Sequence, residues 1–160
     1  QNRAFSARDQ ASFDRAVGEI SAALARELVR DGEGATKLVT VEVRGARSAA
    51  DAERAARKIA NSPLVKTAFF GCDPNVGRIL MAAGSSGAYL ESDRLVLSIG
   101  GVKVAANGRL LVEALGEAGT KMREREFAVQ LDLRLGKSSA TILTCDLSYD
   151  YVRINAEYTT

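Results

Sequence analysis

The chain has 160 residues, of which 46% are hydrophobic and 26% charged, a composition typical of a folded globular protein and not of a disordered chain. Its net charge is +2 and the basic residues are spread along the sequence, which argues against nucleic-acid binding and against attachment to an acidic membrane. No apolar run approaches the ~20 residues that span a bilayer, and the N-terminus has no apolar signal core. We therefore expect a cytoplasmic protein that folds as a single domain over residues 1–160.

Histidine is absent, which excludes Ser-His-Asp and Cys-His catalysis and histidine-based metal sites within this chain. Any acid–base chemistry has to use carboxylates, lysines, an N-terminal amine or water. The two cysteines, Cys72 and Cys145, lack CxxC spacing and are predicted to be free thiols. No metal or cofactor site is predicted.

The chain begins with a helical pattern followed by a strand pattern. Apolar residues recur at helical spacing from Asp9 to Arg30, with Asp9 or Ser12 as the cap, which predicts a helix with one buried face. Gly32 is the expected end of this helix. Residues 37–44 then alternate between apolar and polar, as expected of a half-buried strand that ends before Gly45.

The next segment predicts a second helix, a second strand and a third helix. The alanine-rich residues 48–60 form the helix, with Ser48 as a cap. Residues 64–70 are apolar and rich in strand-forming side chains, and Asp73-Pro74 is typical of a helix start. Because a helical crossover usually connects parallel strands, the two strands predicted so far are expected to be parallel neighbours.

Hairpin patterns dominate the second half. Residues 95–99 and 102–105 are short strands joined by a Gly-Gly turn. Residues 127–135 alternate most clearly, and residues 140–147 are predicted to pair with them as an antiparallel hairpin. Ser148 can cap a final helix. The sequence therefore predicts an α/β (α+β) fold with a mixed sheet.

The turn at residues 31–37, DGEGATK, is the first candidate site. It is not a phosphate-binding loop, because the order Thr-Lys replaces Gly-Lys-Ser/Thr and a strand follows instead of a helix. Two interpretations remain. The turn is either a glycine-rich helix cap with a solvated Glu33, or a close approach to a small ligand whose ammonium group Glu33 receives.

Other polar residues also allow two interpretations. The segment containing Asn75 and Arg78 is either a capped helix start or the wall of a polar pocket. Asn155 lies on a mostly apolar helix face, where a buried amide needs partners and a ligand could be one. The tyrosines of the same tail are expected to be core or interface anchors. Cys145 is expected in the core, whereas Cys72, at a predicted strand end, could be reactive.

Four stretches resemble the C-terminal part of the β chain in the ornithine acetyltransferase family, the glutamate N-acetyltransferases of arginine biosynthesis. They are DGEGATK (31–37), NSPLVKTAFFGCDPNVGRIL (61–80), GKSSATILTCDLSYDYV (136–152) and INAEYTT (154–160). They occur in the family's order, and the resemblance runs across essentially the whole chain. One departure is Val76, where the resemblance leads us to expect tryptophan.

The resemblance implies an N-terminal-nucleophile enzyme made by autocatalytic cleavage of a precursor. A threonine at the head of the β chain takes the acetyl group of N-acetylornithine and passes it to glutamate in a ping-pong cycle. That threonine does not occur in this chain, so no catalytic residue is predicted here. The implied partners are the α chain and the N-terminal β segment, in an α2β2 heterotetramer. No cofactor is implied, although some members accept acetyl-CoA as a donor.

By resemblance, Glu33, Asn155 and Thr160 match the family's substrate contacts, with Glu33 suited to an amino group. Two alternatives remain open. The chain could belong to a paralogue with a different acyl donor or acceptor in a specialised pathway, or it could be a non-catalytic amino-acid-binding module on an α/β scaffold.

Overall fold

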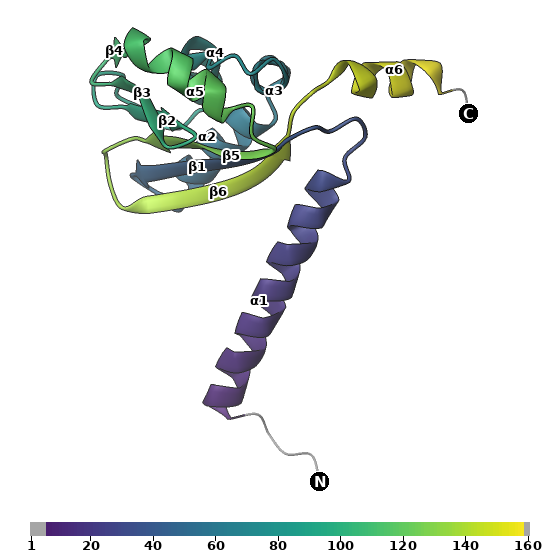
Figure 1. The fold of residues 1–160 in the computed structure, drawn as a ribbon. Helices are drawn as coiled ribbons and strands as arrows, with labels where there is room; N and C mark the ends of the chain where they lie inside the picture. Colours follow the sequence, from purple (N-terminus) through teal and green to yellow (C-terminus); the bar gives the residue numbers. More distant parts are fainter. Residues whose placement is uncertain (1–5, 159–160) are drawn as a thin grey trace.

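The structure is a computed structural model that describes residues 6–158. Its body is a six-stranded mixed sheet with the strand order β4-β3-β2-β5-β1-β6 (Figure 1). The strands are β1 (Leu38–Ala46), β2 (Val96–Ile99), β3 (Val102–Ala106), β4 (Arg109–Leu110), β5 (Glu126–Asp132) and β6 (Ser138–Cys145). β1 and β5 run parallel, and all other neighbours are antiparallel. The mixed α/β fold predicted from the sequence is confirmed.

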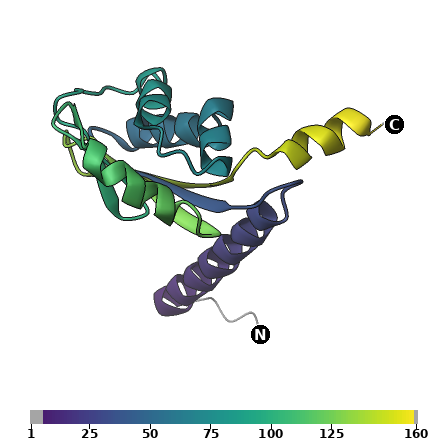
Figure 2. The ribbon, with the colours of Figure 1, turned by 45° about the horizontal axis from the view of Figure 1, so that its top comes forward.

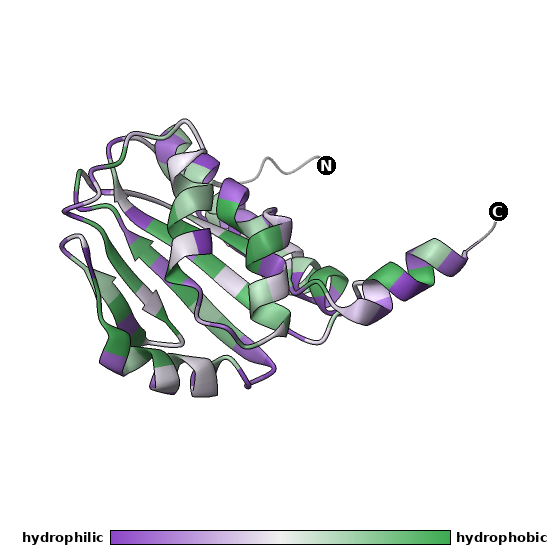
Figure 3. Cartoon of the chain, turned by 90° about the horizontal axis from the view of Figure 1, so that it is seen from above, coloured by the Kyte–Doolittle hydropathy of each residue, from purple (hydrophilic) through white to green (hydrophobic). Residues whose placement is uncertain are grey.

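Three helices form a layer over the sheet, α5 (Leu115–Lys121) packs against β3, and two helices project from the body. The helices are α1 (Ala7–Arg30), α2 (Ala49–Ala60), α3 (Pro63–Phe70), α4 (Val76–Gly84), α5 after the 3-10 turn η1 (Val112–Ala114), and α6 (Tyr149–Glu157). α2, α3 and α4 lie over one face of the sheet, and both α1 and α6 extend away from the body (Figure 2). Viewed from above, hydrophobic and hydrophilic positions alternate along the strands (Figure 3).

The core lies between the sheet and the layer of α2, α3 and α4. Val39, Val41 and Val43 of β1 are fully buried on this face, and Val129 and Leu131 of β5 lie beside them. The alanines of α2 pack against this surface, because their small side chains allow the helix to approach the strands closely. The inward alternation predicted for residues 37–44 and the buried alanine face of residues 48–60 are both confirmed.

The opposite face of the sheet is polar and partly exposed. Ser98, Gln130, Glu42 and Thr141 lie side by side across β2, β5, β1 and β6. The Gln130 side-chain amide donates to the Glu42 carboxylate at 2.8 Å, so this row carries its own hydrogen bonds.

The prediction that the first helix buries one face is wrong. α1 spans 24 residues and buries none of them, because it extends away from the sheet and approaches β1 and β6 only near its C-terminal end (Figure 1). Its cap is Ser6 rather than Asp9 or Ser12. The Ser6 hydroxyl accepts from the Asp9 N–H, and the Asp9 carboxylate accepts from the Ser6 N–H, which forms a capping box.

The predicted strand at residues 64–70 is the helix α3. Ser62 caps it and Pro63 occupies its first turn, where the missing N–H of proline costs nothing. Val65, Ala68 and Phe69 are buried at helical spacing. A short apolar run satisfies strand and helix patterns equally well, and here the capping residues decide. The expected parallel pair is therefore absent, and the parallel partner of β1 is β5.

Two smaller expectations also fail. β1 continues through Gly45 to Ala46, with a register shift between Val43 and Ala46 in its pairing with β6. β5 and β6 do not form a hairpin, because β1 lies between them and pairs with both. The Gly-Gly hairpin of β2 and β3, the cap at Ser148 and the final helix are confirmed. Within the described part of the chain no helix is long and apolar enough to cross a membrane.

Candidate substrate-binding site

The turn at residues 31–37 joins α1 to β1. α1 ends at Arg30, where the Asp31 N–H donates to the Glu27 carbonyl and the Gly32 N–H donates to the Val29 carbonyl. The Ala35 N–H then donates to the Gly32 carbonyl at 2.9 Å, which closes the turn and leaves the Glu33 side chain exposed. The predicted cap and the predicted site thus occupy the same turn, and the two interpretations do not exclude each other.

α6 brings a second predicted residue to this turn. The Ser148 hydroxyl accepts from the Tyr151 N–H at 3.2 Å and caps the helix. Further along α6, the side-chain amide of Asn155 donates to the Glu33 carboxylate and to the Tyr151 carbonyl, both at 2.9 Å. Glu33 and Asn155 are 122 positions apart in the sequence, so the fold brings the two together.

The geometry of this pair leaves two acceptors available. Both amide protons of Asn155 are used, which fixes the orientation of its amide. Among the described residues, the second Glu33 carboxylate oxygen and the Asn155 amide oxygen have no hydrogen-bond donor. A carboxylate beside an amide oxygen suits a ligand that presents an ammonium group and further N–H donors. Asn155 itself is exposed and not buried as expected, because α6 leaves the body of the molecule. Thr160 lies outside the described residues.

The buried carboxylate of Asp146 binds the end of the turn through hydrogen bonds. It accepts from the N–H groups of Thr36 and Lys37 at 2.8 and 2.9 Å and from the Thr36 hydroxyl at 2.5 Å. The sequence did not single out Asp146. The available signal was a lone carboxylate between an apolar strand and a serine cap, and that pattern does not reveal which backbone the carboxylate binds.

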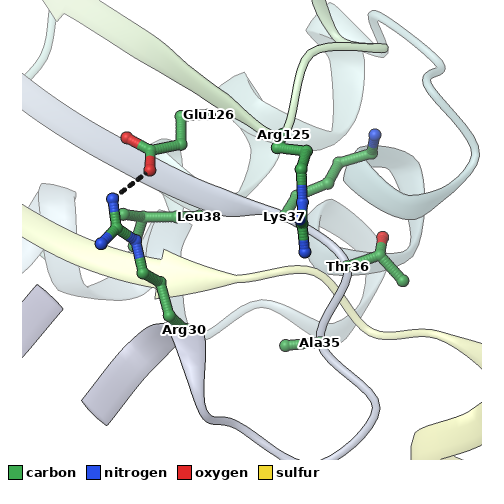
Figure 4. A pocket seen from close by; sticks show the side chains of 7 residues that line it. All are labelled: Arg30, Ala35, Thr36, Lys37, Leu38, Arg125 and Glu126. Atoms are coloured by element: carbon green, nitrogen blue, oxygen red, sulfur yellow. Dashed lines mark hydrogen bonds and ion pairs between the residues drawn. The ribbon is translucent and has the colours of Figure 1, made fainter. Parts of the chain in front are cut away.

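A basic pocket of about 350 Å³ lies between the end of this turn, the end of α1 and the start of β5 (Figure 4). It is lined by Arg30, Thr36, Lys37, Arg125 and Glu126, among others, and the Arg30 guanidinium bonds to the Glu126 carboxylate. This hydrogen bond lowers the pKa of Glu126 and raises the pKa of Arg30. Sequence reasoning missed this pocket, because it forms where the parallel strands β1 and β5 begin together.

The remaining candidates have structural roles. The Asn75 side chain accepts from the Arg78 N–H at 3.1 Å and caps α4, and the Arg78 guanidinium donates to the Leu64 carbonyl at 3.0 Å. Both therefore fit the interpretation of a capped helix start, but the cap is Asn75 and not Asp73, because α4 begins only at Val76. No group of three or more His, Cys, Asp or Glu side chains suited to a metal ion occurs in residues 6–158.

Both cysteines are free thiols, as predicted. Cys145 is only partly buried, at a 3.6 Å contact with the Lys66 ammonium, because its side of β6 is the partly exposed face of the sheet. Cys72 lies 3.4 Å from the Met122 carbonyl and is also partly buried.

Comparison with known proteins identifies the family. The model of the ArgJ family matches residues 1–160. This chain belongs to the ArgJ family.

Relatives named for arginine biosynthesis are similar over nearly the whole chain. The arginine biosynthesis bifunctional protein ArgJ of Geobacter sulfurreducens is 52% identical over 154 residues, which cover 94% of this chain and 38% of that protein. The glutamate N-acetyltransferase of Methanosarcina acetivorans is 49% identical over 153 residues, 92% of this chain and 39% of that protein. The chain therefore spans about two fifths of the length of these relatives.

The crystal structure of ArgJ from Bacillus halodurans has the same fold. It matches with a TM-score of 0.92 and 37% sequence identity, over 98% of this chain and 75% of that chain. The resemblance to the acetyltransferase family described above is thereby confirmed.

Proposed function

We propose that this chain is the substrate-binding part of a glutamate N-acetyltransferase, which moves an acetyl group from N-acetylornithine to glutamate. The observation that carries the proposal is the contact between Glu33 and Asn155, which leaves a carboxylate oxygen and an amide oxygen available side by side. The family supports the reaction, because relatives about half identical to this chain have the names arginine biosynthesis bifunctional protein and glutamate N-acetyltransferase.

The proposed reaction is a ping-pong cycle on a threonine outside this chain. The threonine hydroxyl attacks the acetyl carbonyl of N-acetylornithine, the C–N bond breaks, and ornithine leaves with a proton. The amino group of glutamate then attacks the acetyl ester, the C–O bond breaks, and the threonine hydroxyl is restored. In this cycle Glu33 receives the free ammonium group of the ornithine moiety, and Asn155 and Thr160 supply further polar contacts.

The exposed surface of α1 supports the proposal that the active protein contains more polypeptide. Val17, Ile20, Leu24 and Leu28 form an apolar stripe along the helix and are 45–76% exposed. A long helix derives most of its stability from packing of its apolar face, and a continuous exposed stripe marks an interaction surface. The proposed partners are the α chain and the N-terminal β segment of the same precursor, in a cytoplasmic α2β2 heterotetramer.

Acetyl exchange by the assembled protein tests this proposal. With N-acetylornithine and glutamate as substrates, the assembled protein is expected to produce N-acetylglutamate and ornithine. Replacing N-acetylornithine by acetyl-CoA tests the alternative donor, and neither reaction requires a cofactor. Amino-acid binding without any acetyl transfer would instead favour the non-catalytic module, and transfer between other amino acids would favour the paralogue.

A further inference from the structure

The β6–α6 junction contains a buried carboxylate bound entirely by one turn of the chain. Asp146 is only 3% exposed, and the three hydrogen bonds that it accepts from the described residues all come from Thr36 and Lys37. No lysine or arginine among residues 6–158 forms an ion pair with it. A buried charge without these donors is strongly unfavourable, so the carboxylate holds the turn in one arrangement.

A second attachment lies two residues further along the chain. The Ser148 hydroxyl donates to the Gly34 carbonyl at 2.6 Å while it caps α6. Gly34 has φ +66°, and a Cβ added there would lie 2.5 Å from the Tyr151 nitrogen. The turn therefore rests directly on the backbone of the first turn of α6, and only glycine allows this approach.

These two attachments hold the residues that directly follow Glu33 and thereby set its distance from Asn155. Both side chains are exposed, so burial holds neither in place, and their contact depends on how the turn is docked against α6. We propose that Asp146 is a positioning residue, which docks residues 31–37 against α6 and thereby fixes the Glu33 carboxylate beside the Asn155 amide. This inference rests on the proposed function, because it gives the Glu33–Asn155 pair its role in binding substrate.

Two substitutions of Asp146 test whether its hydrogen bonds to the turn are what substrate binding requires. Asp146→Ala removes both acceptor oxygens and therefore all three hydrogen bonds. In Asp146→Asn, the amide oxygen can still accept from both N–H groups, and the amide nitrogen can donate to the Thr36 hydroxyl. In the assembled enzyme, Asp146→Ala is expected to lower kcat/KM for N-acetylornithine by about tenfold to a hundredfold, mainly through KM. Asp146→Asn is expected to recover most of this loss.

Thr36→Val provides a milder variant if Asp146→Ala does not assemble. It removes only the hydroxyl contact to Asp146 and is expected to raise KM by a few fold. Asp150→Ala is the matched control. Asp150 is an exposed carboxylate in the first turn of α6 that pairs with Arg153, and its loss is expected to leave the kinetics unchanged.

A double-mutant cycle with Glu33→Gln distinguishes positioning from general stabilisation. If Asp146 acts through Glu33, Asp146→Ala (or Thr36→Val) costs little more once Glu33 has been replaced. Hydrogen exchange should also show faster exchange of the Thr36 and Lys37 amide protons. Wild-type kinetics in Asp146→Ala and Thr36→Val, or losses that multiply independently with Glu33→Gln, would overturn the inference. A wild-type protein without acetyl transfer would overturn the proposed function instead.

Discussion

Glu33 is the residue whose substitution tests the substrate-binding proposal most simply. Its carboxylate is exposed and contacts Asn155 through one oxygen, so the second oxygen is available to an ammonium group. Glu33→Gln removes the charge and keeps the shape. Loss of a charge-assisted hydrogen bond is expected to lower kcat/KM for N-acetylornithine by the equivalent of about 1.5–3 kcal/mol.

The control for this substitution is Asp31→Asn, which removes a carboxylate from the same turn. No hydrogen bond or ion pair of the Asp31 side chain occurs among the described residues, so this variant should retain wild-type kinetics. Steady-state rates at varied N-acetylornithine concentration measure both variants. Equal losses in the two would mean that Glu33 acts only through the general charge of the turn.

At the residue scale, the sequence could propose candidate residues for the site but not show which of them are in contact. Glu33 and Asn155 were found through the resemblance, and their separation in the chain conceals that they meet. Asp146 was not predicted, because its partners are backbone groups, which have no sequence signature. The approach of Gly34 to α6 was invisible for the same reason: the paired glycines were interpreted as a close approach to a ligand, whereas Gly34 lies against the backbone of α6.

At the scale of elements, charged side chains hold the end of α1 to the sheet. Arg26 and Arg30 both pair with Glu126 at the start of β5. The hydrogen bond from Arg30 lowers the pKa of Glu126 most, and Arg26 contributes further. A carboxyl group with a lowered folded-state pKa stabilises the folded state above its unfolded-state pKa, and this contribution is lost as the pH falls through the folded-state pKa.

Glu126→Gln should therefore show a pH-dependent effect. The variant is expected to release the C-terminal end of α1 at neutral pH, seen as faster hydrogen exchange of its last turn, and to match the wild type at acid pH where Glu126 is protonated. Added salt should reduce the difference, because the pair is exposed. Glu53→Gln, which breaks an exposed Glu53–Arg57 pair within α2, is the control. A difference in the exchange rate of this last turn between Glu126→Gln and the wild type that stays constant across the pH range would contradict this explanation.

Elements with strong local signals were predicted well, and short apolar segments were not. Alternation identified β1 and β5, and serine caps identified α2 and α6. α3 was predicted as a strand because residues 64–70 fit either period. The neighbours of β1 could not be deduced, because strand order depends on contacts between distant segments and not on local pattern.

At the scale of the whole molecule, the apolar stripe of α1 is the feature that most clearly needs a partner. Ile20→Glu and Leu24→Glu place a charge in the stripe and are expected to weaken assembly with the remaining polypeptide of the enzyme, because a buried unpaired charge is costly. Ala22→Glu is the matched control, since at 100° per residue it lies on the opposite side of α1. Size-exclusion chromatography of the co-produced polypeptides measures the assembly.

The exposed stripe of α1 also explains why a buried face was predicted for this helix but is not found. Periodicity reports that a helix has an apolar face, and it does not report which polypeptide covers that face. α6 gives the same lesson, because its tyrosines are exposed and not in the core, and the alternative that they are interface anchors stays a prediction. Assembly of wild-type strength in Ile20→Glu and Leu24→Glu would show that the partner binds elsewhere.

The most direct test of the central claim is the intact mass of each polypeptide in the assembled protein after incubation with N-acetylornithine alone. We predict one acetyl group on a threonine of a companion polypeptide, none on residues 1–160, and its transfer to glutamate when glutamate is added. Glu33→Gln should slow the appearance of the acetyl group. An assembled and processed protein that never carries an acetyl group, or an acetyl group bound to this chain, would contradict the account.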